Sequence, residues 1–239
     1  MKTYVFSIVI NLFIVFSVPA KIINGYASGI NTAQEAIRKL STLILLDSNM
    51  SVSEKKKMQE YLDRNREFVL FHDLTERLLL QFRMISPDIY NQIDTIKDAG
   101  GRVVDVYVKF LASEKMDGSV AGRTNIPMEG DDAYMSSYGQ HTASVQVVIG
   151  NDALSLLAHE FGHVMYQVPN IATYREFYRV HYILRTADSE EIGHHNTDLS
   201  GQKAFEFQKT FRLQYDSNNW SQKFERPVAV LRKMQKDLD

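Results

Sequence analysis

The sequence predicts an α+β fold that is mainly helical, with a small mixed sheet ahead of one central helix. Apolar residues recur at every third or fourth position through most of the first hundred residues, which is the period of amphipathic helices. Two stretches rich in β-branched residues follow, at 102–110 and 144–149, and both are typical of strands. A turn and a further helical pattern come directly after the second stretch, so the expected order there is strand, turn, helix.

Three helices are expected before the first strand. The apolar pattern predicts one helix over 31–47 and a second, longer one from Ser53 to residue 86. Pro87 should end the second helix, because a proline cannot continue the backbone hydrogen bonding of a helix. A shorter helix is expected over 88–99.

A strand, a connection, a second strand and a helix are expected next. Residues 102–110 predict the first strand, and the glycines and prolines of 113–142 predict a long loop or hairpin. Residues 144–149 predict the second strand, whose exposed edge would accept an extended peptide as an additional strand. The helix that follows begins after Gly150-Asn151-Asp152, where Asn151 or Asp152 is expected to cap it.

Composition narrows the class of protein. The chain has 239 residues, of which 44% are hydrophobic and 23% charged, so it can build a globular core. Its 27 Lys and Arg against 29 Asp and Glu give a net charge of −2, which does not favour a nucleic-acid partner. There is no cysteine, which excludes a disulfide scaffold, a thiol nucleophile and a cysteine-ligated zinc site.

Residues 1–20 are expected to be a cleaved signal peptide. Lys2 precedes an apolar stretch that ends in Val18-Pro19-Ala20, and small residues in those positions suit signal peptidase. The stretch is about fifteen residues long, shorter than the roughly 20 that a spanning helix needs. An uncleaved membrane anchor is the alternative, and Ala27 is a second possible cleavage boundary. The expected product is secreted or periplasmic, with no membrane partner after cleavage, and divides into a helical region at 21–100 and a catalytic-looking region at 101–239.

One motif stands out, His-Glu-Phe-Gly-His at 159–163. On a helix, His159 and His163 lie four residues apart and share a face, so both imidazoles can bind one Zn²⁺ ion. Glu160 is then placed to take a proton from a zinc-bound water. The alternative is a helix on which two histidines are merely hydrogen-bonded polar groups. Gly162 costs helix stability, and it indicates either close packing against another helix or room for substrate or a ligand-bearing helix.

The motif resembles that of the zincin metallopeptidases. The metzincin branch is not matched, because Tyr166 and Pro169 stand where that branch has glycine and histidine. The chain is closer to gluzincins, and distantly resembles the catalytic domain of anthrax lethal factor and the clostridial Pro-Pro endopeptidases. This resemblance implies that His159 and His163 are the first two zinc ligands, that Glu160 is the general base, and that a glutamate on a later helix is the third ligand.

Glu206 is the candidate for that glutamate, on a helix predicted over 198–213 and 43 residues after His163. Catalytic zinc needs three protein ligands and an open position. The helical wheel gives an argument against Glu206, because it lies opposite the apolar side formed by Ala204 and Phe207.

The short segment before that helix supplies alternatives. Asp198 can be the third ligand or the helix N-cap. His194 or His195 can also bind zinc, and we expect His195 to stabilise the oxyanion of a tetrahedral intermediate. The alternative for these two histidines is that both are solvated loop residues.

Together these observations predict a secreted zinc-dependent endopeptidase that acts on a peptide or protein substrate. A zinc-activated water would attack the peptide carbonyl, with Glu160 passing the proton to the leaving amine. Two other classes stay open: a catalytically silent, zinc-stabilised binding protein, and a zinc amidohydrolase that acts on a non-peptide amide. The sequence does not predict cleavage specificity or oligomeric state.

Overall fold

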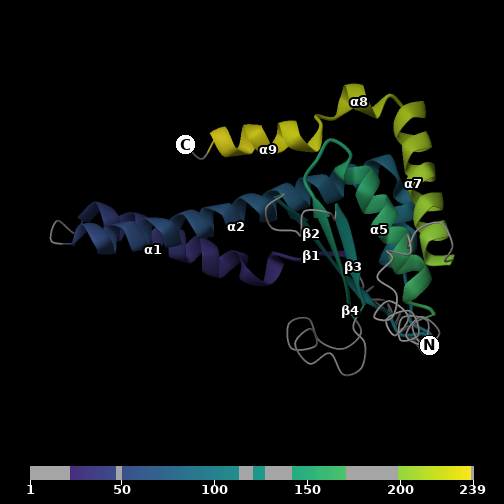
Figure 1. Ribbon diagram of the computed structural model, residues 1–239, viewed down its shortest axis with the longest axis horizontal. Helices are drawn as coiled ribbons and strands as arrows, with labels where there is room; N and C mark the ends of the chain where they lie inside the picture. The colour runs from purple at the N-terminus through teal and green to yellow at the C-terminus, as the bar shows by residue number, and fades with distance from the viewer. Residues whose placement is uncertain (1–21, 47–49, 113–120, 127–141, 171–198, 238–239) are drawn as a thin grey trace, which may run out of the picture.

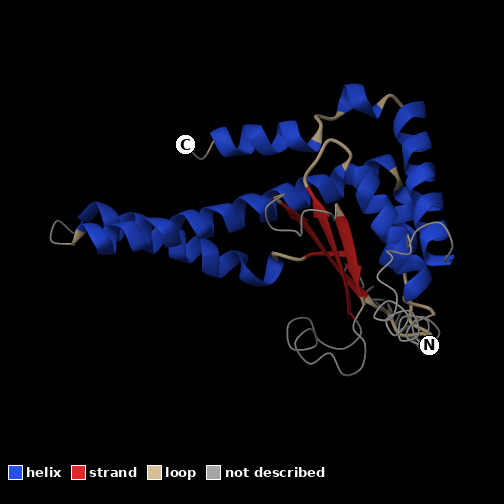
Figure 2. Ribbon diagram, viewed as in Figure 1, coloured by secondary structure: helices blue, strands red, loops and turns tan. Residues whose placement is uncertain are grey.

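The computed structural model describes residues 22–46, 50–112, 121–126, 142–170 and 199–237. These residues form an α+β fold that is mainly helical, with one mixed four-stranded sheet (Figure 2). The sheet precedes the helix that carries the His-Glu-Phe-Gly-His motif, so the predicted fold class is confirmed. The predicted signal peptide, at residues 1–20, lies outside the described residues.

Two long helices form a hairpin that extends well beyond the sheet (Figure 1). They are α1 (Ile30–Leu46) and α2 (Val52–Ile85). The second starts with a capping box, in which the side chain of Ser51 accepts from the backbone N–H of Glu54 and the Glu54 side chain accepts from the backbone N–H of Ser51. Both predicted helices are therefore present, with each end shifted by one residue.

Proline ends α2, as the sequence predicts. The helix stops at Ile85, and Pro87 is the first residue of α3 (Pro87–Asp94). At a first helical position proline loses no hydrogen bond, because that N–H has no partner within the helix. The helix α3 is shorter than the range 88–99 expected from sequence.

The sheet has the strand order β1-β2-β4-β3. The strands β1 (Ile22–Asn24), β2 (Asp105–Leu111) and β4 (Thr142–Val148) are parallel to one another. The last strand, β3 (Gly122–Asn125), runs antiparallel to β4. This corrects one expectation: the strand predicted at 144–149 is not an edge strand, because β3, from the region predicted as a long loop or hairpin, pairs along it. The edge next to the motif helix is β3.

The core lies where β2 and β4 meet the helices. Alternate residues of β2 and most of β4 are buried, and the helices α2 and α5 (Ala153–Gln167) contact the sheet. The ring of Phe82 on α2 packs edge-on against Phe161, with centroids 5.3 Å apart, and stacks on Phe211 at 5.0 Å. The residues with no exposed surface in this core include Leu74, Leu78, Phe82, Val106, Val108, Phe110, Val145, Val147, Leu157 and Phe161.

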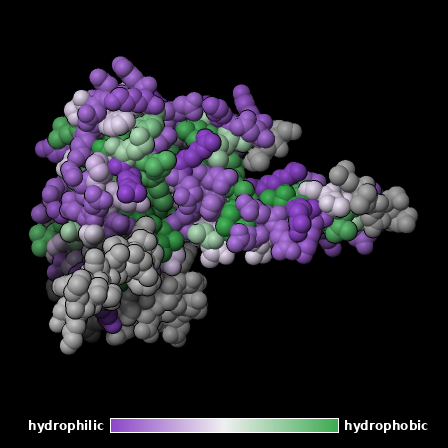
Figure 3. Space-filling view, turned by 180° about the vertical axis from the view of Figure 1, so that it is seen from behind, coloured by the Kyte–Doolittle hydropathy of each residue, from purple (hydrophilic) through white to green (hydrophobic). Residues whose placement is uncertain are grey.

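The remaining helices complete the fold. The helix α7 (Leu199–Ser217) packs along α5, and the short helix α8 (Trp220–Lys223) leads to α9 (Pro227–Lys236), which returns beside α2 (Figure 1). Seen from behind, the surface is mostly hydrophilic with scattered hydrophobic residues (Figure 3). None of the helices in the described part of the chain has the length and apolar character needed to cross a membrane.

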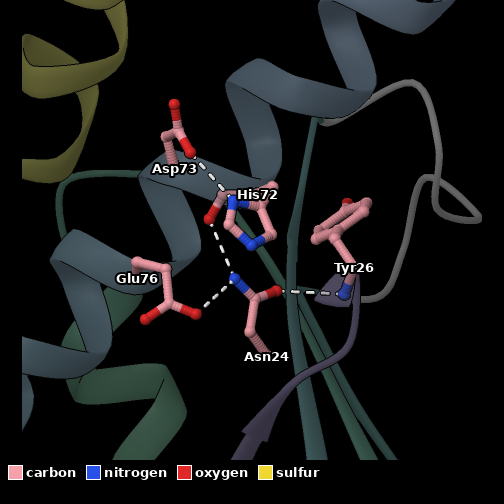
Figure 4. Close-up of polar contacts among 5 residues, drawn as sticks. All are labelled: Asn24, Tyr26, His72, Asp73 and Glu76. Carbon is pink, nitrogen blue, oxygen red and sulfur yellow. Dashed lines mark hydrogen bonds and ion pairs between the residues drawn. The ribbon is translucent and has the colours of Figure 1, made fainter. Parts of the chain in front are cut away.

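A polar cluster around the buried side chain of Asn24 attaches β1 to α2. Asn24, which is 5% exposed, accepts from the backbone N–H of Tyr26 and donates to the His72 carbonyl and to Glu76 Oε1 (Figure 4). The three bonds measure 3.0, 2.9 and 2.8 Å respectively. The first strand is thus held by side-chain bonds as well as by its pairing with β2.

Candidate functional site

The helix α5 presents the motif because of its apolar stripe. The apolar period predicts a buried stripe of Leu154, Leu157, Ala158, Phe161 and Met165; the first four are buried against the core, and Met165 is half-buried and packs against it. A helix turns 100° per residue, so positions 159 and 163 lie on the side of α5 opposite this stripe. Both histidines are there, partly exposed, while Glu160 between them is buried.

The two histidine rings lie close together. Their centroids are 4.9 Å apart, and the ring planes make an angle of 81°. This is the proximity that one metal ion bound by both imidazoles requires, and imidazole nitrogen is a preferred ligand of Zn²⁺. The two predicted histidine ligands are therefore brought together.

His163 has a buried hydrogen-bond partner on α7. Its Nδ1 lies 2.8 Å from the Oγ of Ser200, and Gln167 donates to the same oxygen from its Nε2 at 3.0 Å. Ser200 is 1% exposed and Gln167 is 6% exposed. Metal-binding histidines usually use one ring nitrogen for the metal and the other for such a bond.

Glu160 lies beneath the edge strand β3. It is only 6% exposed, and the hydroxyl of Thr124 donates to its Oε2 at 2.6 Å. A Cβ on Gly122 would lie 2.5 Å from its Oε1, so this strand can lie over the carboxyl because position 122 is glycine. Burial raises the pKa of Glu160 to about 7, and the hydrogen bond from Thr124 opposes that rise.

Gly162 allows the close crossing of α5 and α7. A Cβ at this position would overlap the backbone of Lys203 and Ala204. Of the two explanations open from the sequence, close packing against a neighbouring helix accounts for the glycine. The same contact fixes the rotation of α7, with Ala204, Phe207 and Phe211 buried.

Glu206 is on the far side of α7 from this contact. Its side chain is 62% exposed and is paired with Lys203, whose Nζ lies 2.9 Å from Oε2. Phe205 is the neighbour that reaches the histidines, with its ring 5.3 Å from that of His159. Among the described residues, no group of three or more His, Asp or Glu side chains could hold a metal ion. The structure therefore does not bring Glu206 to His159 and His163. This agrees with the helical-wheel argument against Glu206 as the third ligand.

The other candidates from the sequence cannot be placed. His194, His195 and Asp198 lie outside the described residues. Asp152 is the N-cap residue of α5 but makes no capping bond with its side chain.

Sequence reasoning missed Thr124, which bonds to Glu160, Ser200, which bonds to His163, and Gln167, which bonds to Ser200. Gln167 carries a signal that was available, because it lies four residues after His163 on the same helix face. Thr124 and Ser200 carry none, because they come from distant elements whose register and rotation no local pattern fixes.

Comparison of the chain with protein-family models, with curated proteins and with solved structures found no match.

Proposed function

We propose that this chain is a secreted zinc-dependent endopeptidase, with His159 and His163 as two of its zinc ligands and Glu160 as its general base. The observation that carries the proposal is the arrangement on α5: two histidine rings 4.9 Å apart, with a buried carboxyl between them in the sequence. The sequence resemblance to gluzincins supports the same assignment. Bound zinc would act as a Lewis acid that polarises the substrate carbonyl and acidifies water.

Glu160 would move the proton. It would accept a proton from the attacking water and give it to the leaving amine. A general base works best when its pKa is near the working pH, and burial raises the pKa of Glu160 to about 7. The hydroxyl of Thr124 would hold the carboxylate in one orientation during both transfers.

The substrate would lie along β3. This strand ends the sheet order, and its other edge has no strand partner among the described residues. A peptide that pairs there as an additional strand would run past Thr124 and Gly122, which contact Glu160. An edge strand supports an extended peptide as substrate, in preference to a small non-peptide amide.

The third ligand is proposed to come from the residues just before α7. Glu206 is exposed and paired with Lys203, whereas Ser200 at the start of α7 contacts His163. Asp198, His194 and His195 precede that contact by a few residues. We therefore prefer one of these three, and the role of His195 in stabilising the oxyanion remains part of the proposal.

The position of β1 supports cleavage after Ala20 in preference to Ala27. The strand β1 begins at Ile22, and Ile22, Asn24 and Tyr26 are all buried. Cleavage after Ala27 would remove this strand and its bonds to α2. The mass of the exported chain should therefore correspond to a first residue of Lys21.

A catalytically silent zinc protein is the second candidate, and one observation favours it. Phe205 contacts His159 from the helix on which a glutamate ligand was expected. Such a protein would hold zinc with four protein ligands and leave no open position.

The test is metal content and activity measured on the same variants. We expect one zinc per wild-type chain, per Glu160→Gln chain and per Glu206→Gln chain, and a large loss in His163→Ala. One of Asp198→Asn, His194→Ala and His195→Ala should also lose zinc. Cleavage of a peptide library should fall by about 100-fold or more in Glu160→Gln. Zinc without cleavage in the wild type would favour the silent protein, and no zinc in the wild type would overturn both proposals.

A further inference from the structure

The helix α9 carries a row of cations on one side. Arg226 is its N-cap residue, and Arg232, Lys233 and Lys236 follow within the helix. They lie six, seven and ten residues after Arg226, and at 3.6 residues per turn these spacings bring all four to the same side. All four residues are exposed.

This row of cations borders a groove of about 460 Å³. Asn151 lines the same groove from the turn before α5, which reaches α9 at its first turn (Figure 1). Val228 and Ala229 add apolar surface beside the cations. Among the described residues that line the groove, Glu225 is the only acidic one. The groove is therefore a concave, partly apolar surface with an excess of positive charge.

Most of this positive charge is not used within the chain. Lys233 Nζ lies 3.9 Å from Glu225 Oε1, and the two side chains are 66% and 57% exposed. An ion pair as exposed as this one contributes little stability. In the described part of the chain, Arg226, Arg232 and Lys236 have no ion-pair partner. These three charges are therefore available to an anionic partner.

The stability of α9 explains only half of the row. Lys233 and Lys236 are in the last turn, where a cation interacts favourably with the negative end of the helix dipole. Arg226 is at the opposite end, where a cation is unfavourable. The dipole of α9 therefore gives no reason for Arg226, whereas its place beside the groove does.

We propose that this groove binds an acidic segment of a partner protein in an extended conformation. Arg226 and Lys236 are ten residues apart in the chain, which is about 15 Å along the helix, and an extended peptide covers that length with about five residues. A single small anion would meet only part of the row, and a flat lipid surface would not follow a concave groove. The net charge of −2 for the whole chain does not favour a nucleic acid.

The test is a binding titration with the purified full chain. Fluorescence anisotropy follows a labelled peptide of six glutamates, with a peptide of six glutamines for comparison, at about 0.15 M salt. We expect saturable binding of the glutamate peptide alone, weakening as salt is added because exposed charges are screened. Arg232→Gln combined with Lys236→Gln should weaken this binding by about tenfold.

The matched control is Lys55→Gln combined with Lys57→Gln. It removes the same charge from exposed positions near the start of α2 and should leave binding of the glutamate peptide unchanged. Circular dichroism checks that both double variants are folded, and Arg226→Gln is the second groove variant, with a smaller loss expected.

No binding of the glutamate peptide by the wild type, or an equal loss in the two double variants, would overturn the proposal. Competition by inorganic phosphate, duplex DNA or vesicles containing phosphatidylserine tests the other occupants. If any of these binds the groove more tightly than the peptide does, the proposal is also overturned. The titration needs neither zinc nor cleavage, so its result is independent of whether the proposed function is correct.

Discussion

Thr124 on β3 holds its hydroxyl 2.6 Å from the Oε2 of Glu160 on α5, and 3.2 Å from the backbone carbonyl of the same residue. The edge strand of the sheet is thereby attached to the proposed general base. Thr124 is 36 residues before Glu160 in the chain, so the contact depends on the sheet pairing that places β3 beside α5. The protonation state of the Glu160 carboxyl therefore depends on the position of Thr124 in the edge strand β3.

The first prediction concerns the pKa of Glu160 in the metal-free protein. Replacing Thr124 with valine removes a donor that stabilises the carboxylate, while burial remains. The pKa of Glu160 should therefore rise above about 7, by about one unit. Carbon-13 NMR titration of the side-chain carboxyl groups measures it, with Glu160→Gln to assign the signal. Thr124→Ser keeps the hydroxyl and should titrate as the wild type, and an unchanged value in Thr124→Val would rule out the hydrogen bond as a cause.

The second prediction concerns stability as a function of pH. The pKa of Glu160 is raised from its ordinary value of 4.5 to about 7. Between these values the unfolded chain ionises first, so the folded state binds more protons and its free energy of unfolding falls as pH rises. Above about pH 7 the Glu160 carboxyl is ionised in both the folded and the unfolded chain, so its contribution to the free energy of unfolding no longer changes with pH.

Glu160→Gln removes this titration and is the matched comparison. We expect the free energy of unfolding of metal-free wild type, relative to Glu160→Gln, to fall by roughly 2–3 kcal/mol from pH 5 to pH 8. Urea denaturation at a series of pH values, with a chelator present, measures the difference. A difference that is flat or rises over this range would contradict the raised pKa.

The sequence predicted the long elements of this fold and the two histidines. The helices α1, α2, α5 and α7 have apolar patterns several turns long, and such patterns identify a helix without reference to its surroundings. The strand β3 could not be located within the region predicted as a long loop or hairpin, because Gly122–Asn125 is short and polar. The strand β1, with three residues, gives equally little local signal.

The zinc ligands proposed from the sequence show the same limit of local sequence patterns within one site. His159 and His163 come from one helix, so their spacing alone predicts that they share a face. Glu206 is on another helix, and its direction depends on how α7 is rotated against α5. That rotation is set by the contact of Gly162 with the backbone of Lys203 and Ala204, which joins residues some forty positions apart.

The third prediction tests that contact. Gly162→Ala should lower the free energy of unfolding by about 1–2 kcal/mol, although alanine favours a helix over glycine by about 1 kcal/mol. The reason is that the added methyl group would meet the backbone of α7, which cannot rotate aside as a side chain can. Chemical denaturation provides the measurement. Gly150→Ala is the control, because a Cβ at Gly150 has nothing within 4 Å, and a stabilised Gly162→Ala would show that the helices are not in close contact.

The last prediction concerns the cluster that attaches β1 to α2. Asn24 donates from one amide nitrogen to Glu76 Oε1 and to the His72 carbonyl (Figure 4). Asn24→Asp replaces this donor with an acceptor and, at pH 7, sets a carboxylate at a buried position beside the carboxylate of the exposed Glu76. The free energy of unfolding should fall by about 2–3 kcal/mol at pH 7, and by less at about pH 4, where one carboxyl can be protonated and donate.

The control for Asn24→Asp is the same substitution at Asn170. That side chain is exposed and bonds only to the nearby Tyr166 carbonyl among the contacts described, so a change within about 0.5 kcal/mol is expected. Both variants should be compared by urea denaturation at the two pH values. Equal losses at Asn24 and Asn170, or a loss at Asn24 that does not depend on pH, would mean that the amide of Asn24 does not hold β1 to Glu76.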